Sequence, residues 1–91
     1  MYDLMTTGRF KRDLKTAIRR KYDISLLDEV VMSLLAGKPL PAHNKDHALV
    51  GNWIGHRECH ITPDWLLVYK IDKSVLVLTL TRTGTHSDLS F

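Results

Sequence analysis

The stretch HITPDWLLVYK, residues 60–70, decides how this 91-residue chain is arranged. Its first part is polar and contains Pro63, which has no backbone N–H and therefore suits the gap between two strands better than the interior of a ladder. Its second part, which begins at Trp65, is an apolar and aromatic run that is typical of a buried strand. The stretch predicts a β-hairpin whose mouth carries His60, Asp64 and Trp65.

Strands on both sides of this stretch extend the hairpin into a meander. Residues 53–61 are predicted to form a strand before the turn, and residues 75–81 form a third apolar run after a short turn at 72–74. In an antiparallel meander, the start of the second strand and the end of the third lie at the same end of the sheet. The third strand is expected to end at Arg82, with His86 shortly after it, so the sequence predicts that both residues meet the mouth of the hairpin there.

The first half of the chain predicts two amphipathic helices after a short edge strand at residues 2–7. From Arg9 onward, apolar side chains recur every three or four positions, which is typical of a helix with one buried face. Ser25 and Asp28 form a capping-box-like start for the second helix, and Gly37 is placed to end it. The apolar stripes consist of Phe10, Leu14, Ala17, Ile18 and Tyr22 and of Leu27, Val30, Val31, Leu34 and Leu35. Both helices are therefore expected to pack on the sheet.

The order of these elements predicts an α+β fold, a two-helix hairpin packed on a small, mainly antiparallel sheet in the order β-α-α-β-β-β. A chain of 91 residues is expected to form one domain, here residues 1–91. The single cysteine, Cys59, excludes an intramolecular disulfide and favours a reducing compartment. No apolar run approaches the ~20 residues of a membrane span, and no secretory signal is evident, so we expect a cytoplasmic protein without a membrane partner.

Positive charge is concentrated near the start of the chain. The formal net charge is +3, and more than half of the 13 Lys and Arg residues precede residue 22. Such a block favours a polyanionic partner, either nucleic acid or an acidic protein. The alternative is a solvated helix face. The residues concerned are Arg9, Lys11, Arg12, Lys15, Arg19, Arg20 and Lys21.

Five histidines raise the question of a metal site. Their spacing argues against one, because the chain has no Cys-x-x-Cys or His-Glu-x-x-His motif. His56 and His60 would lie roughly 13 Å apart on a strand that rises ~3.3 Å per residue. Cys59 and His60 point to opposite faces of a strand, so they cannot form a nucleophile–base pair. We therefore expect neither a metal nor another cofactor.

General acid–base chemistry suits the predicted cluster better. An imidazole titrates near ~6.5, so it can give and take protons at neutral pH. RNA can be cleaved by attack of its own 2′-hydroxyl if the protein supplies a base, an acid and a cation for the crowded phosphate. His60, Asp64 and His86 supply the acid and base types. Arg82 supplies the cation, and Trp65 could stack on an RNA base.

Several short motifs resemble the YafQ branch of the RelE/ParE toxin superfamily, and the resemblance covers nearly the whole chain. The motifs are Lys45-Asp46-His47, Gly51-Asn52-Trp53, Arg57-Glu58-Cys59-His60, Pro63-Asp64-Trp65-Leu66-Leu67-Val68-Tyr69-Lys70 and Arg82-Thr83-Gly84-Thr85-His86. The resemblance implies a RelE-like fold and a toxin of a type II toxin–antitoxin pair. Toxins of this branch are ribosome-dependent endoribonucleases that cut messenger RNA in the decoding site.

The resemblance also implies functional positions and partners. The family's functional positions fall on His47, His60, Asp64, Trp65, Arg82 and His86. Its C-terminal aromatic corresponds to Phe91, which lies one position further from His86 than in the family pattern. The basic helix is expected to face ribosomal RNA. A small acidic antitoxin is expected to cover the site or the basic surface in the resting state.

Two other functions remain open from the sequence. One is a ParE-type toxin, which has the same fold and a gyrase target but no acid–base cluster. The other is a non-catalytic RNA-binding module, which would use the basic helix and Trp65 without needing histidines at the end of the sheet. The set of His60, Asp64 and His86 favours the endoribonuclease over both.

Overall fold

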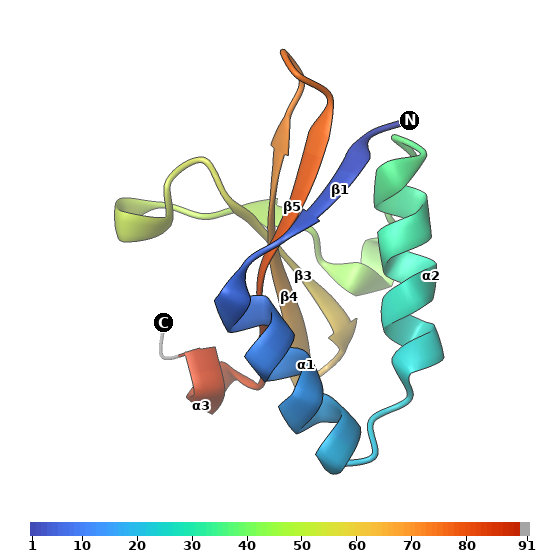
Figure 1. The fold of residues 1–91 in the computed structure, drawn as a ribbon, viewed down its shortest axis with the longest axis vertical. Helices are drawn as coiled ribbons and strands as arrows, with labels where there is room; N and C mark the ends of the chain where they lie inside the picture. The colour runs from blue at the N-terminus through green and yellow to red at the C-terminus, as the bar shows by residue number, and fades with distance from the viewer. Residues whose placement is uncertain (90–91) are drawn as a thin grey trace.

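The computed structural model describes residues 1–89 and shows a five-stranded sheet with two long helices on one of its faces (Figure 1). This arrangement confirms the predicted α+β fold. The strands are β1 (Asp3–Thr6), β2 (His47–Ala48), β3 (Arg57–Thr62), β4 (Trp65–Asp72) and β5 (Val77–Gly84). The helices are α1 (Gly8–Arg19), α2 (Ile24–Leu35) and α3 (His86–Leu89), and two 3-10 turns are η1 (Ala42–Asn44) and η2 (Gly51–Trp53).

The strand order is β1-β5-β4-β3-β2, and β3, β4 and β5 form the predicted antiparallel meander. β1 is the exception to the antiparallel pairing, because it lies parallel to β5 at one edge of the sheet. Leu66 of β4 pairs with both His60 of β3 and Gly84 of β5. The end of β3, the start of β4 and the end of β5 therefore lie side by side, and the residues after β5 return to the mouth of the hairpin.

β4 is buried on both faces of the sheet, which explains its unbroken apolar sequence. Trp65 and Leu67 belong to the main core, which α1 and α2 cover. Leu66 and Val68 face the other side of the sheet and form a smaller cluster with Leu89 of α3. The last residue of α3 thus attaches this short helix to the face of the sheet opposite the two long helices.

The ends of the long helices differ slightly from the prediction. Asp23 caps α2 rather than Ser25, since its carboxylate accepts a hydrogen bond from the Ser25 N–H at 3.1 Å. α1 ends at Arg19, before the predicted Tyr22. Gly37 follows α2 with φ 72°, a left-handed conformation that ends the helix as predicted.

Two strands and one apolar stripe also differ from the prediction. Trp53 ends the 3-10 turn η2 and residues 54–55 form a further turn, so β3 begins only at Arg57. β5 starts and ends later than predicted, and Arg82 therefore lies within the strand rather than at its end. Ile18 was predicted to be buried, but it is 55% exposed because it lies at the margin of the apolar face of α1. No helix within residues 1–89 is long and apolar enough to cross a membrane.

Candidate active site

Three side chains from neighbouring segments meet where the ends of β3, β4 and β5 lie side by side. His86 is the first residue of α3, and its Nδ1 lies 3.1 Å from Oδ1 of Asp64 in the turn between β3 and β4. The ring of His60, near the end of β3, lies 5.6 Å from the ring of His86 between centroids. The structure thus brings together three of the residues that the predicted meander placed at this end. His86 and Asp64 are exposed and His60 is half-buried, so a polymeric substrate can reach the cluster.

The contact between His86 and Asp64 is charge-assisted. Hydrogen bonds from the side chain and then the backbone of His86 lower the pKa of the Asp64 carboxyl below its ordinary value, so the carboxylate is ionised at neutral pH. An ionised carboxylate only accepts hydrogen bonds, and therefore Nδ1 of His86 is the donor. This leaves Nε2 as the atom of the His86 ring that can exchange protons with a substrate.

The position of His60 is set by the loop before β2. The Nδ2 amide of Asn44 donates to the carbonyl of His60 at 2.7 Å, and Asn44 is only 4% exposed. Nδ1 of His60 lies 3.3 Å from the carbonyl oxygen of Pro63, which can only accept. Nδ1 therefore carries the proton of the neutral ring, and Nε2 is the atom that can accept another.

β2 brings a further histidine to this region. Such a short strand leaves no periodic pattern and was not predicted from the sequence. Its register sets His47 opposite Glu58 of β3, and Nε2 of His47 lies 3.5 Å from Oε1 of Glu58. Nδ1 of His47 lies 2.8 Å from the carbonyl oxygen of Lys45. His47 is thus held between a carbonyl and a carboxylate.

Glu58 is a candidate site residue that the sequence analysis missed. It lies two positions before His60, so the two side chains share one face of β3. Glu58 is only 5% exposed, and its Oε2 has no hydrogen-bond partner among the described residues. A buried carboxylate oxygen without a partner is costly, and such costs concentrate at functional sites. The available signal in the sequence was its place on the same strand face as His60.

Asp46 attaches the loop before His47 to the sheet. Its carboxylate accepts hydrogen bonds from Nη2 of Arg57 at 3.1 Å and from the hydroxyl of Tyr69. The hydrogen bond to Asp46 raises the pKa of the Arg57 guanidinium. Burial, and then the contact with Asp46, raise the pKa of the Tyr69 hydroxyl. Both donors keep their protons at neutral pH, so this attachment persists under physiological conditions.

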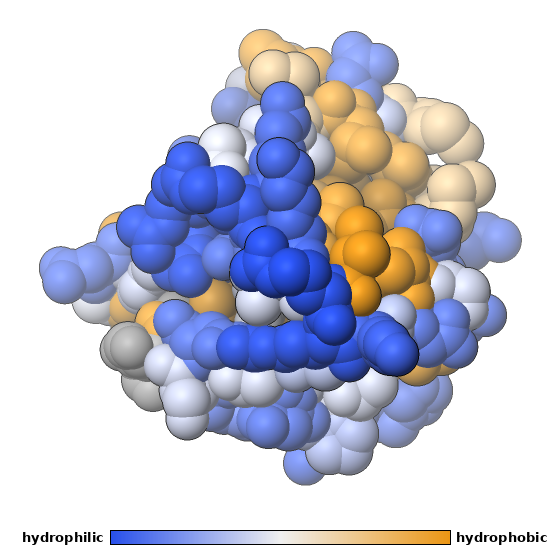
Figure 2. Space-filling model, turned by 60° about the horizontal axis from the view of Figure 1, so that its bottom comes forward, coloured by the Kyte–Doolittle hydropathy of each residue, from blue (hydrophilic) through white to orange (hydrophobic). Residues whose placement is uncertain are grey.

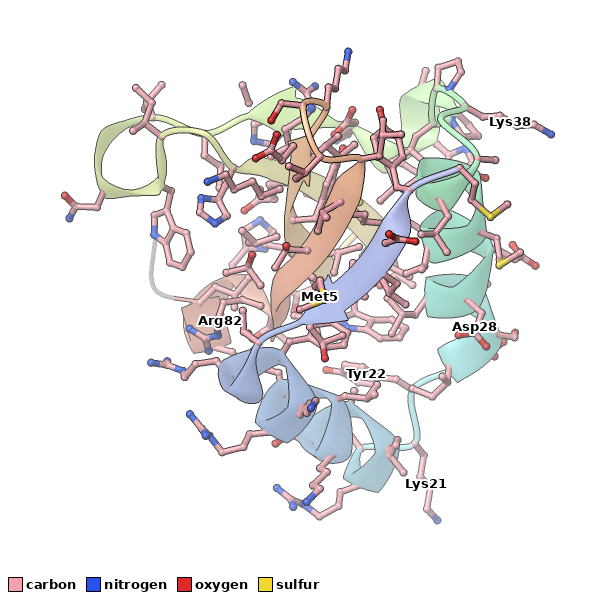
Figure 3. All side chains as sticks on the ribbon, turned by 45° about the horizontal axis from the view of Figure 1, so that its top comes forward. Met5, Lys21, Tyr22, Asp28, Lys38 and Arg82 are labelled. Atoms are coloured by element: carbon pink, nitrogen blue, oxygen red, sulfur yellow. The ribbon has the colours of Figure 1, made fainter. Side chains whose placement is uncertain are left out.

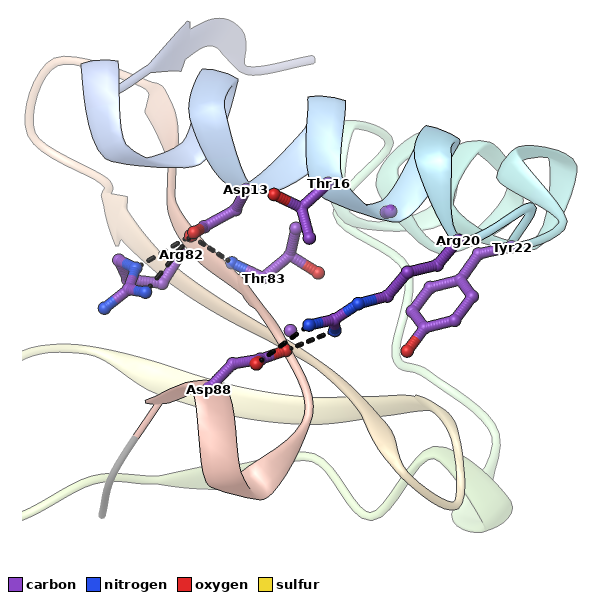
Figure 4. A pocket seen from close by; sticks show the side chains of 9 residues that line it. Asp13, Thr16, Arg20, Tyr22, Arg82, Thr83 and Asp88 are labelled. Carbon is purple, nitrogen blue, oxygen red and sulfur yellow. Dashed lines mark hydrogen bonds and ion pairs between the residues drawn. The ribbon is translucent and has the colours of Figure 1, made fainter.

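Arg82 was predicted to meet the histidine cluster, but its side chain is paired with a carboxylate on α1 instead. Its Nε donates to Oδ2 of Asp13 on α1 at 2.7 Å, and its Nη2 donates to Oδ1 at 3.3 Å (Figure 4). The backbone N–H of Thr83 donates to the same carboxylate at 3.1 Å. The side chains of Arg82 and Asp13 are only 12% and 16% exposed. Arg82 is therefore already paired with a carboxylate, which comes from a helix far away in the sequence.

Trp65 is a core residue, and its burial argues against the predicted role as a stacking platform for RNA. It is 2% exposed, so its indole ring is not open to a base. Its Nε1 donates to Oγ1 of Thr83 at 2.9 Å, and its ring packs against that of Tyr22 at 5.0 Å between centroids. Figure 3 shows Tyr22 directed back toward the sheet, whereas the adjacent Lys21 points outward. The sequence did not reveal this burial, because a strand buried on both faces shows no alternation of apolar and polar residues from which exposure can be read.

α1 presents most of the predicted basic residues to solvent. Figure 2 shows a band of strongly hydrophilic side chains over the part of the surface where α1 lies. Five of these side chains are exposed and have no carboxylate partner among the described residues: Arg9, Lys11, Arg12, Lys15 and Arg19. Arg20 differs, because its Nη1 and Nη2 donate to the two carboxylate oxygens of Asp88 at 2.6 and 3.2 Å. The prediction that Arg20 contacts RNA therefore conflicts with its engagement by α3.

The remaining candidates do not add to the cluster. Cys59 is fully buried, and burial raises the pKa of its thiol to about 12, so it stays protonated. Among residues 1–89, no group of three or more His, Cys, Asp or Glu side chains is placed to hold a metal ion. Phe91 lies outside the described residues.

Comparison with known proteins identifies close relatives over nearly the full length. A family model described as the bacterial toxin YafQ of a type II toxin–antitoxin system matches residues 2–91. The chain is 42% identical to the mRNA interferase toxin YafQ of Escherichia coli K12 over 89 residues, which cover 96% of this chain and 94% of the relative. The crystal structure of YafQ from E. coli BL21(DE3) superposes with a TM-score of 0.91 at 38% identity, covering 98% of both chains. A metal-bound toxin from Helicobacter pylori superposes with a TM-score of 0.92 at 43% identity, covering 98% of this chain and 99% of the other.

Proposed function

This chain belongs to the YafQ family of toxins of type II toxin–antitoxin systems, and we propose that it is an endoribonuclease that cleaves messenger RNA on the ribosome and so inhibits translation. The cluster of His60, Asp64 and His86 carries the proposal, because it offers a proton acceptor and a proton donor at an exposed end of the sheet. The relative from E. coli K12 that is named an mRNA interferase toxin supports the same activity.

The proposed reaction uses the RNA as its own nucleophile. The ribose 2′-oxygen attacks the adjacent phosphorus, the bond from phosphorus to the 5′-oxygen breaks, and the products are a 2′,3′-cyclic phosphate and a 5′-hydroxyl. His60 takes the proton of the 2′-hydroxyl at Nε2, and His86 gives a proton from Nε2 to the leaving 5′-oxygen. Proton transfers of this kind typically contribute about 10²- to 10⁴-fold in rate.

Asp64 acts on His86 rather than on the RNA. Its ionised carboxylate accepts from Nδ1 and so holds the imidazole in the orientation that leaves Nε2 for the RNA. A carboxylate whose pKa is lowered is a weak proton acceptor at neutral pH, which favours His60 as the base.

Two further groups complete the proposed site. His47 and its neighbour Glu58 extend the proton network on the same side of the sheet as His60. Arg82 acts as a phosphate clamp when a phosphate oxygen replaces Asp13 as its partner, because a guanidinium binds either group through two parallel hydrogen bonds.

The proposed activity requires two macromolecular partners. The exposed basic residues of α1 face ribosomal RNA, whose phosphates favour clustered Lys and Arg. A cognate antitoxin holds the toxin inactive, as supported by an E. coli relative of 39% identity that was solved as the DinJ–YafQ toxin–antitoxin complex. The protein would act in the cytoplasm, where ribosomes translate.

A purified translation system with a defined message tests this function. We expect cleavage only of ribosome-bound message, mapped ends that carry a 2′,3′-cyclic phosphate and a 5′-hydroxyl, and no cleavage by His86→Ala. No proposed step uses a metal, so cleavage of preformed complexes should persist at an EDTA concentration that leaves the ribosomes intact. RNA binding without cleavage would instead identify a binding module. Inhibition of gyrase supercoiling without RNA cleavage would identify a ParE-type toxin.

A further inference from the structure

The short helix that carries His86 needs external support. α3 has four residues, His86–Leu89. An isolated helix of this length is unstable in water, because the cost of nucleation exceeds the gain from so few hydrogen bonds. The orientation of His86 therefore depends on the contacts that hold the rest of α3.

One set of contacts is local and surrounds Asp88. The Asp88 N–H donates to Oγ1 of Thr85 at 3.1 Å, and the Thr85 N–H donates to Oδ2 of Asp88 at 2.9 Å. These reciprocal bonds form a capping box around the first turn of the helix, which begins at His86. Leu89 is buried at 4% exposure against the sheet. Together they shape α3 and attach its last residue to the sheet, but they do not connect it to α1.

The second contact comes from α1, 68 positions away in the sequence. Arg20, the residue that follows α1, donates from Nη1 and Nη2 to the two carboxylate oxygens of Asp88 at 2.6 and 3.2 Å (Figure 4). Asp88 also lies directly over Gly84, at the end of β5. A Cβ added at Gly84 would lie 2.9 Å from Cβ of Asp88, a distance that real Cβ atoms do not tolerate. The bidentate pair therefore holds α3 against both α1 and the last residue of β5.

We propose that Arg20 and Asp88 are positioning residues of the active site, whose bidentate pair locks α3 in the orientation that presents His86 to Asp64 and to the RNA. This inference rests on the proposed endoribonuclease function. Neither partner belongs to the proposed catalytic groups, since Asp88 is two residues from His86 and neither Arg20 nor Asp88 forms a hydrogen bond with Asp64. Arg20 thereby has a structural task that differs from the RNA contact expected of the other basic residues of α1.

The charge state of the pair supports this task. Hydrogen bonding from Arg20, followed by that from the Thr85 backbone, holds the pKa of Asp88 well below its usual range. The pair is therefore intact at neutral pH, and it is lost only when the pH falls through that lowered pKa. Its side chains are 40% and 32% exposed, and exposed ion pairs contribute little to global stability. Variants of either residue should therefore fold.

The test is a double-mutant cycle in the ribosome-bound cleavage assay under single-turnover conditions. Asp88→Asn keeps an oxygen for the Thr85 N–H but removes the charge that binds Arg20. We expect Asp88→Asn and Arg20→Gln each to lower the rate constant at saturating ribosomes by about 10- to 100-fold, as misplacement of a reacting group does. The double variant should lose no more than either single variant, because both remove the same contact.

The two substitutions change the net charge in opposite directions, so an effect of charge on ribosome binding can be distinguished from an effect on the orientation of α3. Asp88→Asn removes a negative charge and should not weaken binding to ribosomal RNA, whereas Arg20→Gln removes a positive charge. Lys15→Gln is the matched control for lost positive charge on α1. It should raise the half-saturating ribosome concentration without lowering the rate constant at saturation. If Arg20→Gln behaves as Lys15→Gln does, or if the effects of the two single variants multiply in the double variant, the inference is overturned.

A third variant perturbs the same position without changing any charge. Gly84→Ala places a methyl group against Asp88 and should lower the rate constant at saturation in the same way. The ¹⁵N shifts of the His86 ring, which report whether Nδ1 still donates to Asp64, should change in Asp88→Asn and in Gly84→Ala. Unchanged shifts would overturn the inference even if the wild-type protein proved not to cleave RNA. Absence of cleavage by the wild type, with changed shifts in both variants, would overturn the proposed function alone.

Discussion

Nδ1 of His86 lies 3.1 Å from a carboxylate oxygen of Asp64, although the two residues are 22 positions apart and belong to different segments. The contact decides which ring nitrogen remains available for proton transfer, because Nδ1 is occupied and Nε2 is not part of the pair. It also lowers the pKa of the Asp64 carboxyl, which keeps the negative charge beside the imidazole at neutral pH. This relationship is the basis of the first two predictions.

His86→Ala should abolish growth arrest while leaving the fold intact. The proposed general acid would be lost, and such a loss typically costs about 10²- to 10⁴-fold in rate. The side chain is 55% exposed, so the free energy of unfolding should change by no more than about 0.5 kcal/mol. Toxicity after induction and thermal unfolding of the purified variant measure the two effects. A folded variant with full toxicity would remove His86 from the mechanism.

The pH–rate profile measured in single turnover should be bell-shaped, with a different residue responsible for each of its two limbs. The Asp64 carboxyl has a lowered pKa, so its pairing with His86 holds above about pH 4 and fails only as the pH falls through that pKa. Asp64 therefore cannot produce an acidic limb near neutral pH, and we assign that limb to His60. The alkaline limb should disappear in His86→Ala, wherever residual activity is measurable. Loss of the acidic limb in that variant would make His86 the base.

Charge reversal at Arg12, Lys15 and Arg19 should weaken ribosome binding and flatten its dependence on salt. These side chains are exposed, and fewer neutralised phosphates mean fewer released counterions. The rate constant at saturation should not change, since none of the three contacts the histidine cluster. Ribosome binding measured across a salt titration provides the check. An unaltered slope would identify this face of α1 as a solvated surface with no role in binding.

Trp65→Phe should lower stability but not the activity of the folded protein. The substitution removes the hydrogen bond from Nε1 to Thr83 and leaves space against Tyr22, at a cost of about 1–3 kcal/mol in the free energy of unfolding. Urea unfolding and cleavage per folded molecule are the measurements. A variant as stable as the wild type that has lost cleavage would restore the stacking role that burial argues against.

Local patterns in the sequence were sufficient to predict the main elements and one part of the site. Apolar side chains at helical spacing predicted α1 and α2, and the run from Trp65 onward predicted β4. Pro63 marked the turn between the hairpin strands. In an antiparallel meander the third strand ends beside the turn that joins the first two strands. His60, Asp64 and His86 could therefore be placed together without any knowledge of tertiary packing. The short strand β2, which sets His47 beside Glu58, left no comparable pattern.

The sequence by itself therefore determined the α+β order and the meeting of the histidines with Asp64, because both depend on periodicity and on strand connections. Only the tertiary structure decided which charges are already paired. Asp13 reaches Arg82 across 69 positions, and Arg20 reaches Asp88 across 68, through the packing of α1 beside the end of β5. Likewise, the sequence of β4 does not reveal toward which face of the sheet Trp65 points, because this strand is buried on both faces. Such contacts depend on how layers pack in three dimensions, and no local spacing records that packing.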